Sequence, residues 1–146
     1  MMTADASGQP ERVYAEANRL AKLGISVIPI AAGTKEPPVG FRWGKYAHEA
    51  ADASERYTWF IEQGHQLAVV PGTISGNLVP LDYDSPTGFE SHAAKYPIIR
   101  EFPRIRTGSG KTHVWVRTAR PVKKYVCTTP DGGKLEVRAG THYTLC

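Results

Sequence analysis

The chain is poor in cysteine and has no long apolar run. Cys127 and Cys146 are its only cysteines, so it lacks the disulfide framework of a small secreted protein, although a single disulfide is chemically allowed. Two cysteines do not make a metal site by themselves either. No apolar stretch approaches the roughly 20 residues that cross a bilayer, and residues 1–10 lack the basic and apolar regions of a signal peptide. These absences predict a cytoplasmic protein with no membrane partner.

The composition is that of one globular domain with a basic bias. Hydrophobic residues make up 41% and charged residues 22% of the 146 residues, which are enough to bury a hydrophobic core. The net charge of +4 suits an anionic partner such as nucleic acid. Basic residues gather in the second half of the chain: Arg100, Arg104, Arg106, Lys111, Arg117, Arg120, Lys123 and Lys124. This cluster is either a contact surface for phosphates or an ordinary solvated face.

The first half of the sequence predicts alternating helices and strands. Apolar residues recur at helical spacing within residues 11–23, and Gly24 suits the end of that helix. Pro29 predicts that the following strand, residues 25–30, ends there or lies at a sheet edge. Further along we expect a loop over 31–44, a helix over 54–63 capped by Ser54, strands over 67–70 and 78–83, and a turn over 72–77.

The second half predicts one helix and then short alternating strands. We expect a helix over 87–96, strands over 104–106, 113–117 and 134–138, the start of another strand at 143–145, and a tight turn over 130–133. The chain stops in a strand-like stretch, which is typical of a fragment of a longer protein. We therefore expect a flexible tail at residues 1–10 and one truncated domain over 11–146.

The stretch Asp82-Tyr83-Asp84 carries the clearest chemical signal. It follows an apolar run, residues 78–81, and strand side chains alternate, so both carboxylates are expected on one face near the strand end. Two such carboxylates repel each other unless a cation lies between them, and Mg²⁺ prefers oxygen ligands of this kind. The alternative is that Asp82 merely ends a strand and Asp84 begins an ordinary turn.

The glycine-rich stretch Thr107 to Thr112 matches only part of a nucleotide-hydrolysing P-loop. Ile105 stands where that motif requires its first glycine, and a strand-like segment follows where it requires a helix. A loop containing Gly108, Ser109 and Gly110 can nevertheless hold phosphates with its backbone N–H groups.

Three polar residues on the predicted strands complete the candidate site. His113 follows the glycine-rich loop and can donate a hydrogen bond to a phosphate oxygen, although a lone histidine is more often structural. Glu136 alternates with Leu135 and Val137, so its carboxylate is either solvent-facing or a third metal ligand. Arg138 shares that face and either binds phosphate through two hydrogen bonds or forms a surface pair with Glu136.

The order of these motifs resembles the archaeo-eukaryotic primase superfamily. An apolar strand ends in Asp-x-Asp, a glycine-rich turn leads to a histidine, and a later strand carries Glu-x-Arg. The chain is similar in particular to the N-terminal domain of bifunctional DNA primase–polymerases of phages, plasmids and mobile elements. The first half agrees as well, through its opening helix, Gly24, the strand 27–30, Lys35 with Pro37, Trp43, and the turn from Gly72 to Gly76. The resemblance covers residues 11–145.

The resemblance implies a fold and a set of site residues. The fold is α+β and primase-like, with an N-terminal α/β unit packed on an RRM-like antiparallel sheet and the active site between them. Asp82, Asp84 and Glu136 would be catalytic and would hold two Mg²⁺ or Mn²⁺ ions. Nucleotide-binding residues would be His113, Lys111, Arg138, Gly108, Ser109, Gly110 and, as a further candidate, Lys35. Lys111 departs from the family pattern, which usually has a small residue there.

The implied activity is template-dependent joining of nucleoside triphosphates, as in a DNA primase or DNA polymerase, on single-stranded DNA. The family domain usually continues through a Pro-Pro-Ser-like segment, so any helicase region of the parent chain would lie beyond Cys146. One alternative is a non-catalytic module that binds nucleotides or single-stranded DNA. Another is a metal-dependent nuclease, because carboxylate clusters also support phosphodiester cleavage.

Overall fold

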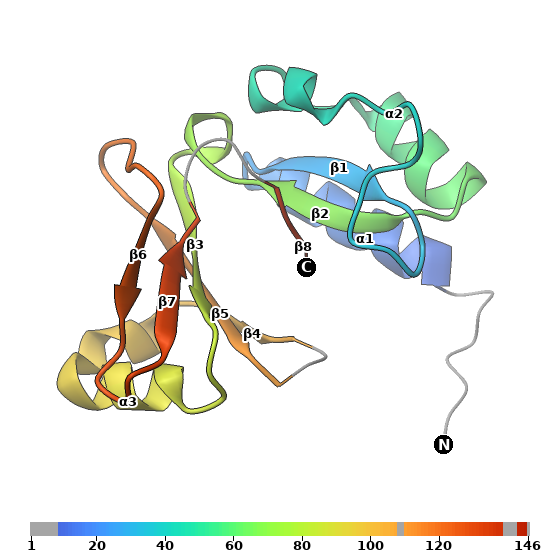
Figure 1. Ribbon diagram of the computed structural model, residues 1–146. Coiled ribbons are helices and arrows are strands. Elements are labelled where there is room, and N and C mark those ends of the chain that lie inside the picture. Colours follow the sequence, from blue (N-terminus) through green and yellow to red (C-terminus); the bar gives the residue numbers. More distant parts are fainter. Residues whose placement is uncertain (1–8, 108–109, 139–142, 146) are drawn as a thin grey trace.

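Two antiparallel sheets, each with helices of its own, form the protein (Figure 1). The computed structural model describes residues 9–107, 110–138 and 143–145. The first part contains α1 (Gln9–Lys22), β1 (Ser26–Ile30), the 3-10 turn η1 (Trp43–Ala47), α2 (Ala53–Tyr57), the π turn η2 (Thr58–Glu62), β2 (Gln66–Val70) and the 3-10 turn η3 (Thr73–Ser75). The second part contains β3 (Leu78–Tyr83), α3 (Gly88–Lys95), the 3-10 turn η4 (Pro97–Glu101), β4 (Arg104–Arg106), β5 (Thr112–Arg117), β6 (Tyr125–Thr128), β7 (Lys134–Val137) and β8 (Thr144–Leu145). This mixture confirms the predicted α+β class.

The first unit, residues 9–75 together with β8, surrounds a small sheet in the order β1-β2-β8. α1 packs against β1, β2 and η2, and Ala17, Ile28 and Phe60 are fully buried in the resulting core. Burial of this apolar surface is what holds short elements together. Within the described ranges, no helix is both long and apolar enough to cross a membrane.

Two local predictions for the first unit are confirmed. Gly24 ends α1 with a φ of 77°, and its N–H donates to the carbonyl of Ala21 while the next N–H, that of Ile25, donates to Leu20. This pair of bonds is the Schellman motif, which favours glycine at the left-handed position. Pro29 lies in an edge strand, since β1 has β2 as its single strand neighbour among the described residues.

The second helix begins before the predicted cap. Asp52, rather than Ser54, is the N-cap residue. The Asp52 carboxylate accepts from the Glu55 N–H at 2.8 Å, and the Glu55 carboxylate accepts from the Asp52 N–H at 3.2 Å. This capping box satisfies two N–H groups that the helix itself leaves unpaired, which is why it outcompetes a lone serine.

The second unit, residues 78–137, is a sheet in the order β4-β5-β3-β7-β6. β3 lies at its centre even though Pro80 has no N–H for a ladder bond. The pairing of β3 with β7 begins at Leu81, whereas the pairing with β5 spans all of β3. Beyond that pairing, the Arg138 N–H donates to the Pro80 carbonyl at 2.9 Å, so the proline removes one bond on this side, the reciprocal one to Arg138.

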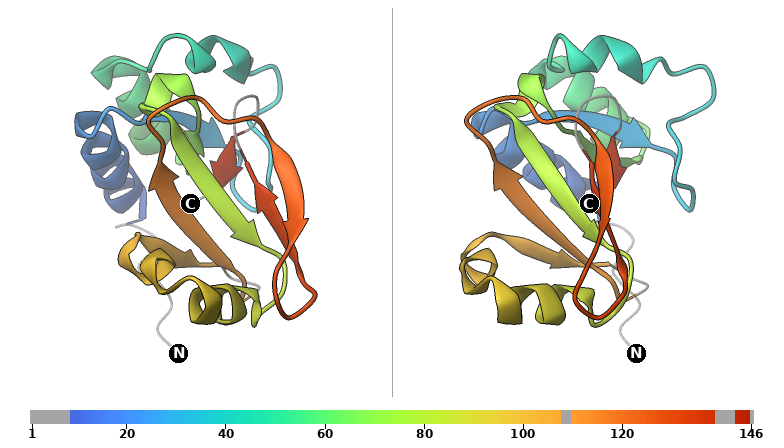
Figure 2. Two further views of the ribbon diagram at one scale, coloured as in Figure 1. Left: turned by 90° about the vertical axis from the view of Figure 1, so that its left-hand side faces the viewer. Right: turned by 60° about the vertical axis from the view of Figure 1, so that its left-hand side comes forward.

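The two faces of the second sheet pack against different partners. On one face Tyr83, Val114 and Leu135 form a core with Phe89 and Ala93 of α3. Residues of the opposite face, Leu78 and Trp115, join the core of the first unit. Figure 2 shows β3 and β5 running from the first unit at one end toward α3 at the other. Because strand side chains alternate, Asp82 lies on the face of Leu78, opposite to α3.

One strand is missing from the sequence-based expectation and another is confirmed. The sequence predicts no strand at residues 125–128, yet β6 forms there and pairs with β7 in a hairpin. The strand predicted at 143–145 exists as β8, and the sequence does not predict its partner, which is β2 of the first sheet. In both cases long-range backbone pairing, which side-chain alternation does not encode, selects the partner.

Asp131, in the turn between β6 and β7, fastens this hairpin to the loop after β3. Its carboxylate accepts hydrogen bonds from the hydroxyls of Thr129, of Thr87 at 2.5 Å and of Ser85 at 2.9 Å. It also accepts the Gly133 N–H at 3.0 Å. These bonds to the charged form, that of Thr129 above all, hold the pKa of Asp131 far below its usual range. A Cβ at Gly133 would lie 2.9 Å from Ser85 Oγ, so this turn accepts glycine and little else.

We predict that Asp131→Asn lowers the melting temperature at pH 7 by a few degrees, because an amide accepts fewer of these bonds. A depressed folded-state pKa stabilises the protein above the ordinary value of 3.8, and this contribution is lost as the pH falls through the folded-state pKa. The difference between wild type and variant should therefore shrink in acid, as measured by urea unfolding at neutral and acidic pH. Glu101→Gln, an exposed control, should show no such difference at either pH. Equal stability of Asp131→Asn and wild type at pH 7 would contradict the role of this carboxylate.

Candidate functional site

Three polar side chains lie in one row across the centre of the second sheet. The register places His113 of β5 opposite Asp82 of β3, and Asp82 opposite Glu136 of β7. Residues directly opposite each other on neighbouring strands project from the same face, with Cβ atoms about 4.5–5.5 Å apart. The structure thus brings Glu136 to the face of Asp82 although the two are far apart in the sequence.

Asp82 is held between a histidine and an arginine. Its Oδ1 lies 3.2 Å from His113 Nε2 and its Oδ2 lies 3.2 Å from Arg138 Nε, and 15% of its side chain is exposed. The hydrogen bond from His113, with the positive charges of Arg138 and Lys111, holds the pKa of Asp82 below its usual range against the effect of burial. Asp82 is therefore an ionised acceptor at neutral pH.

Arg138 links the two carboxylates of the row. Besides its contact with Asp82, its Nη2 lies 3.6 Å from Oε2 of Glu136. Its Nε is buried and makes an ion pair with Asp82 rather than a well-directed hydrogen bond. Since neighbouring carboxylates repel each other, the positive charge of Arg138 between Asp82 and Glu136 reduces that repulsion.

Two lysines also contact Glu136, and the sequence analysis assigned neither to it. Lys124 Nζ lies 3.2 Å from Oε1, and Lys134 Nζ lies 4.0 Å from Oε2. The strand register would have predicted the contact of Lys124: Val126 lies opposite Glu136, and Lys124 comes two residues before Val126, on the same face by alternation. This prediction requires knowing that β6 pairs with β7.

Asp84 continues the row just beyond the end of β3. Tyr83 is buried toward α3, so Asp82 and Asp84 alternate with it to the opposite face. The Asp84 N–H donates to the Lys134 carbonyl at 2.9 Å, which extends the pairing with β7 by one residue. Its carboxylate is half exposed and pairs with Lys111, whose Nζ lies 3.0 Å from Oδ1. Lys111, the departure from the family pattern, thus lies at the acidic cluster.

The loop before His113 is the turn of the β4–β5 hairpin. The Thr107 N–H donates to the Lys111 carbonyl at 2.8 Å, and the Lys111 N–H donates to Thr107 Oγ1 at 3.1 Å. Gly110 has a φ of 83°, a left-handed conformation that other residues rarely adopt. A strand follows this loop, which excludes a P-loop, as the sequence indicates. Gly108 and Ser109 lie outside the described residues.

Lys35 is not brought to the carboxylates. It lies in an exposed loop of the first unit, and its backbone carbonyl accepts a hydrogen bond from the Tyr143 hydroxyl at 3.0 Å. In the part of the chain that the structure describes, its side chain has no contact with a site residue. Its predicted role in nucleotide binding therefore has no support from the side-chain contacts.

The donor chemistry of this cluster fits a hard divalent cation. Carboxylate oxygens are the ligands that Mg²⁺ and Mn²⁺ prefer, and three carboxylates lie along one strand end. Within residues 9–107, 110–138 and 143–145, however, no three His, Cys, Asp or Glu side chains are arranged as the ligands of one ion. Each carboxylate is instead paired with a cationic side chain. Metal ligation here requires movement of lysine or arginine side chains, while the backbone already presents the acids.

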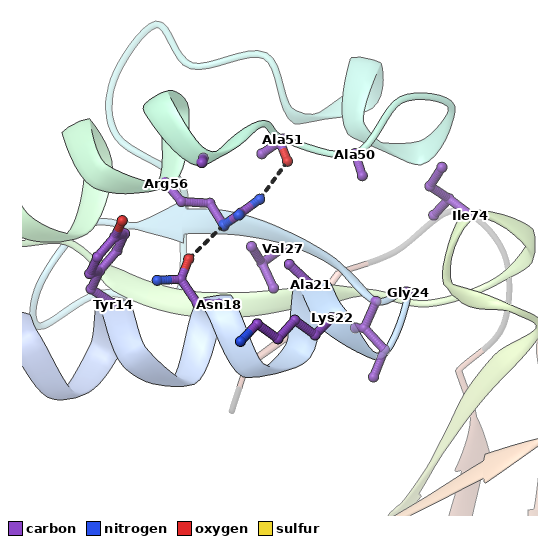
Figure 3. Close-up of a pocket in the computed structure, with 12 residues that line it drawn as sticks. Tyr14, Asn18, Ala21, Lys22, Gly24, Val27, Ala50, Ala51, Arg56 and Ile74 are labelled. Carbon is purple, nitrogen blue, oxygen red and sulfur yellow. Dashed lines mark hydrogen bonds between the residues drawn. The ribbon is translucent and has the colours of Figure 1, made fainter.

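Two hollows among the described residues lie outside this row of charges. One, of about 590 Å³, lies between α1 and the segment before α2. Figure 3 shows Arg56 in it, donating to Asn18 Oδ1 at 2.9 Å and to the Ala51 carbonyl at 2.8 Å. The other, of about 610 Å³, lies between α1 and the β4–β5 edge, and its walls, which include Ile105 and Trp115, are mainly apolar. Neither is lined by a predicted site residue.

The chain matches a known protein family over most of its length. Residues 17–146 match the family described as bifunctional DNA primase/polymerase, N-terminal. The matched range contains all the predicted site residues and nearly the whole chain, and it confirms the resemblance drawn from the motifs. No curated protein matches the chain.

We predict that Arg138→Gln lowers the free energy of unfolding by about 1–3 kcal/mol in the absence of divalent ions, because it leaves two largely buried carboxylates without their shared cation. Addition of Mn²⁺ should recover part of this loss, since the ion supplies the missing charge. Urea unfolding with and without Mn²⁺ measures both effects. Arg120→Gln, a control at an exposed position, should change neither quantity. A variant as stable as wild type would show that Arg138 does not balance the carboxylates.

Proposed function

Because the chain belongs to the family of bifunctional DNA primase/polymerase N-terminal domains, we propose that it joins nucleoside triphosphates on a single-stranded DNA template. Primase/polymerase activity is general in this family, which generally uses divalent metals. The observation that supports the proposal best is the row His113–Asp82–Glu136 on one face of the second sheet. We place the reaction in the replication of a phage, plasmid or mobile element.

The proposed architecture is primase-like. The first unit would correspond to the N-terminal α/β unit and the second sheet to the RRM-like sheet. Leu78 and Trp115 pack against the first unit from the same face that carries Asp82, so the acidic cluster opens on the side of the sheet that the first unit borders. This placement supports an active site between the two units.

Asp82, Asp84 and Glu136 would hold the metal ions, Mg²⁺ or Mn²⁺. When bound, these ions would lower the pKa of the attacking 3′-hydroxyl and stabilise the charge on the leaving pyrophosphate. The chain itself would keep Asp82 ionised, through the depressed pKa of this carboxyl. It would orient the acids through the register of their strands.

The triphosphate would be bound by the cationic side chains around the acids. His113 and Arg138 already contact Asp82, and Lys111 contacts Asp84. The positive charges of Lys111 and Arg138 would neutralise phosphate oxygens, the arginine fork would offer two parallel hydrogen bonds, and the His113 ring would donate one. By the family resemblance, the backbone N–H groups of Gly108 and Ser109 would add further donors, and that of Gly110 would do so if released from the Thr107 carbonyl, to which it donates at 2.9 Å. Lys35 is retained as a contributor on the family resemblance alone.

The hollow of about 610 Å³ beside the β4–β5 edge is the proposed path of the template. It is lined by Ile105, which the register places opposite His113, and by Trp115 and Phe102. Single-stranded nucleic acids bind where bases stack on apolar and aromatic side chains and where cations contact the backbone. Arg117, on the face of Trp115, also lines this hollow and would supply a cation, whereas the Arg104 guanidinium lies 4.6 Å from the ring centroid of Phe89 on the α3 side.

We predict that Asp82→Asn combined with Asp84→Asn reduces nucleotide incorporation by about 10³-fold or more, because neutral amides bind divalent ions poorly. Binding of single-stranded DNA should be retained. Primer extension with labelled nucleotide measures the first quantity, and fluorescence anisotropy measures the second. Asp52→Asn is a matched control, since asparagine caps a helix as well as aspartate does.

Three outcomes of this assay separate the candidate functions. Extension by wild type and not by the double variant supports the proposed activity. Nucleotide and DNA binding without incorporation by wild type identifies a binding module. Shortening of the oligonucleotide by wild type identifies a nuclease. An active double variant would show that the two aspartates do not bind the catalytic metals.

We predict that Arg117→Gln weakens binding of single-stranded DNA and reduces the slope of log K against log salt by about 0.7, the loss of one phosphate contact. Arg117 also donates to the Leu23 carbonyl at 2.7 Å and so links the two units, so circular dichroism should first show that the variant is folded. Lys95→Gln removes the same charge from α3, which covers the other face of the sheet, and should leave the slope unchanged. An unchanged slope for Arg117→Gln would place the template elsewhere.

A further inference from the structure

Lys124 differs from the other cations that contact Glu136. Arg138 and Lys134 belong to β7 or directly follow it, so the strand fixes where their side chains begin. Lys124 comes from residues 118–124, a segment without helix or strand, and it approaches Glu136 from across the hairpin. It contacts Oε1, whereas the other two contact Oε2. Lys124 is therefore the cation at the Oε1 side of this carboxylate, among the residues described.

The Lys124–Glu136 ion pair forms in the metal-free protein and is weak enough for another cation to replace Lys124. Nζ lies 3.2 Å from Oε1, and 42% of the lysine side chain is exposed, while 15% of the Glu136 side chain is. A pair whose ammonium remains in contact with water contributes little to stability. A divalent ion that binds at Oε1 carries twice the charge of the ammonium and repels it, so the ion and the ammonium compete for this oxygen.

We propose that Lys124 is a counter-ion that competes with the metal for Glu136 and, once displaced, binds the nucleotide's phosphates. The inference rests on the proposed function and adds coupling between its two ligands. In the metal-free protein, Lys124 neutralises Glu136. Metal binding frees the ammonium next to the place where the triphosphate's negative charge arrives. The nucleotide's phosphates then bind the displaced Lys124 ammonium and so stabilise the displaced state. Metal and nucleotide therefore each raise the affinity for the other by the same factor.

Lys111 shows the same arrangement at the other end of the cluster. Its Nζ lies 3.0 Å from Asp84 Oδ1, and its side chain is 39% exposed. Two carboxylates of the cluster are thus paired with a flexible, partly exposed lysine, while the third, Asp82, is paired with His113 and Arg138. Asp82 has two partners, both less exposed than these lysines, so the acids at the two ends are the ones whose partners exchange readily.

The test measures Mn²⁺ affinity directly, by the electron paramagnetic resonance signal of the free ion, with the full chain. Lys124→Gln should bind Mn²⁺ about two- to fivefold more tightly than wild type, because the competing ammonium is gone. Addition of a non-hydrolysable nucleoside triphosphate should tighten Mn²⁺ binding by a smaller factor in the variant than in wild type. Lys124→Arg keeps the charge and should retain wild-type behaviour. Lys123→Gln removes a neighbouring charge that has no ion pair in the described chain, and it should leave Mn²⁺ affinity unchanged.

The outcomes separate this inference from the proposed function. Equal Mn²⁺ affinity of wild type and Lys124→Gln, both folded by circular dichroism, overturns the inference and leaves the function standing. Equal coupling to the triphosphate in both proteins overturns its second half. If neither protein binds Mn²⁺, with or without the triphosphate, the proposed function fails and the inference fails with it. If Lys124→Gln does not fold, Lys124→Met replaces it, with the same expected gain in affinity.

Discussion

The position of β3 between β5 and β7 is the constraint on which the site depends. The register of these strands, and no local motif, places His113, Asp82 and Glu136 in one row. A slip of β7 by one residue would turn Glu136 into the core beneath α3 and bring Leu135 or Val137 to the charged face. The apolar neighbours of Glu136 prevent this slip, because they are buried against Tyr83 and Val79 on the other side. Packing on one face thus determines the chemistry on the opposite face.

A second constraint is charge balance. Acids crowded on one face of a sheet repel each other unless cations neutralise them, and the chain itself provides a cation for each. The charges of the three acids are therefore balanced by side chains of the chain itself. The same side chains that balance the acids are suited to bind phosphate, so a substrate complex can keep the charges balanced by exchanging partners. This double use explains why lysines and an arginine surround the acids, although one of the expected ligands is itself a cation.

The sequence predicted the elements better than it predicted their partners. Helix α1, its end at Gly24 and the edge position of Pro29 follow from local rules, because backbone conformation at these points is dictated by residue type. The shared face of Asp82 and Asp84 follows from alternation alone. β6 and the role of Lys124 did not follow, since both depend on which strands pair across the turn at residues 130–133. The helix cap at Asp52 was missed because Ser54 fits the same local pattern.

The hydrogen bonds of Asp131 to the β6–β7 hairpin affect how fast the site can adjust to its ligands. Ser85 and Thr87, directly after the acidic strand end, and Gly133, just before β7, are bonded to one carboxylate. The main chain beneath Asp84 and Glu136 is thus braced from both flanks. What remains to adjust when ligands arrive is rotation of side chains, which at partly exposed positions takes picoseconds to nanoseconds. Binding of ligands at this sheet would then involve rotation of side chains rather than rearrangement of the β6–β7 hairpin.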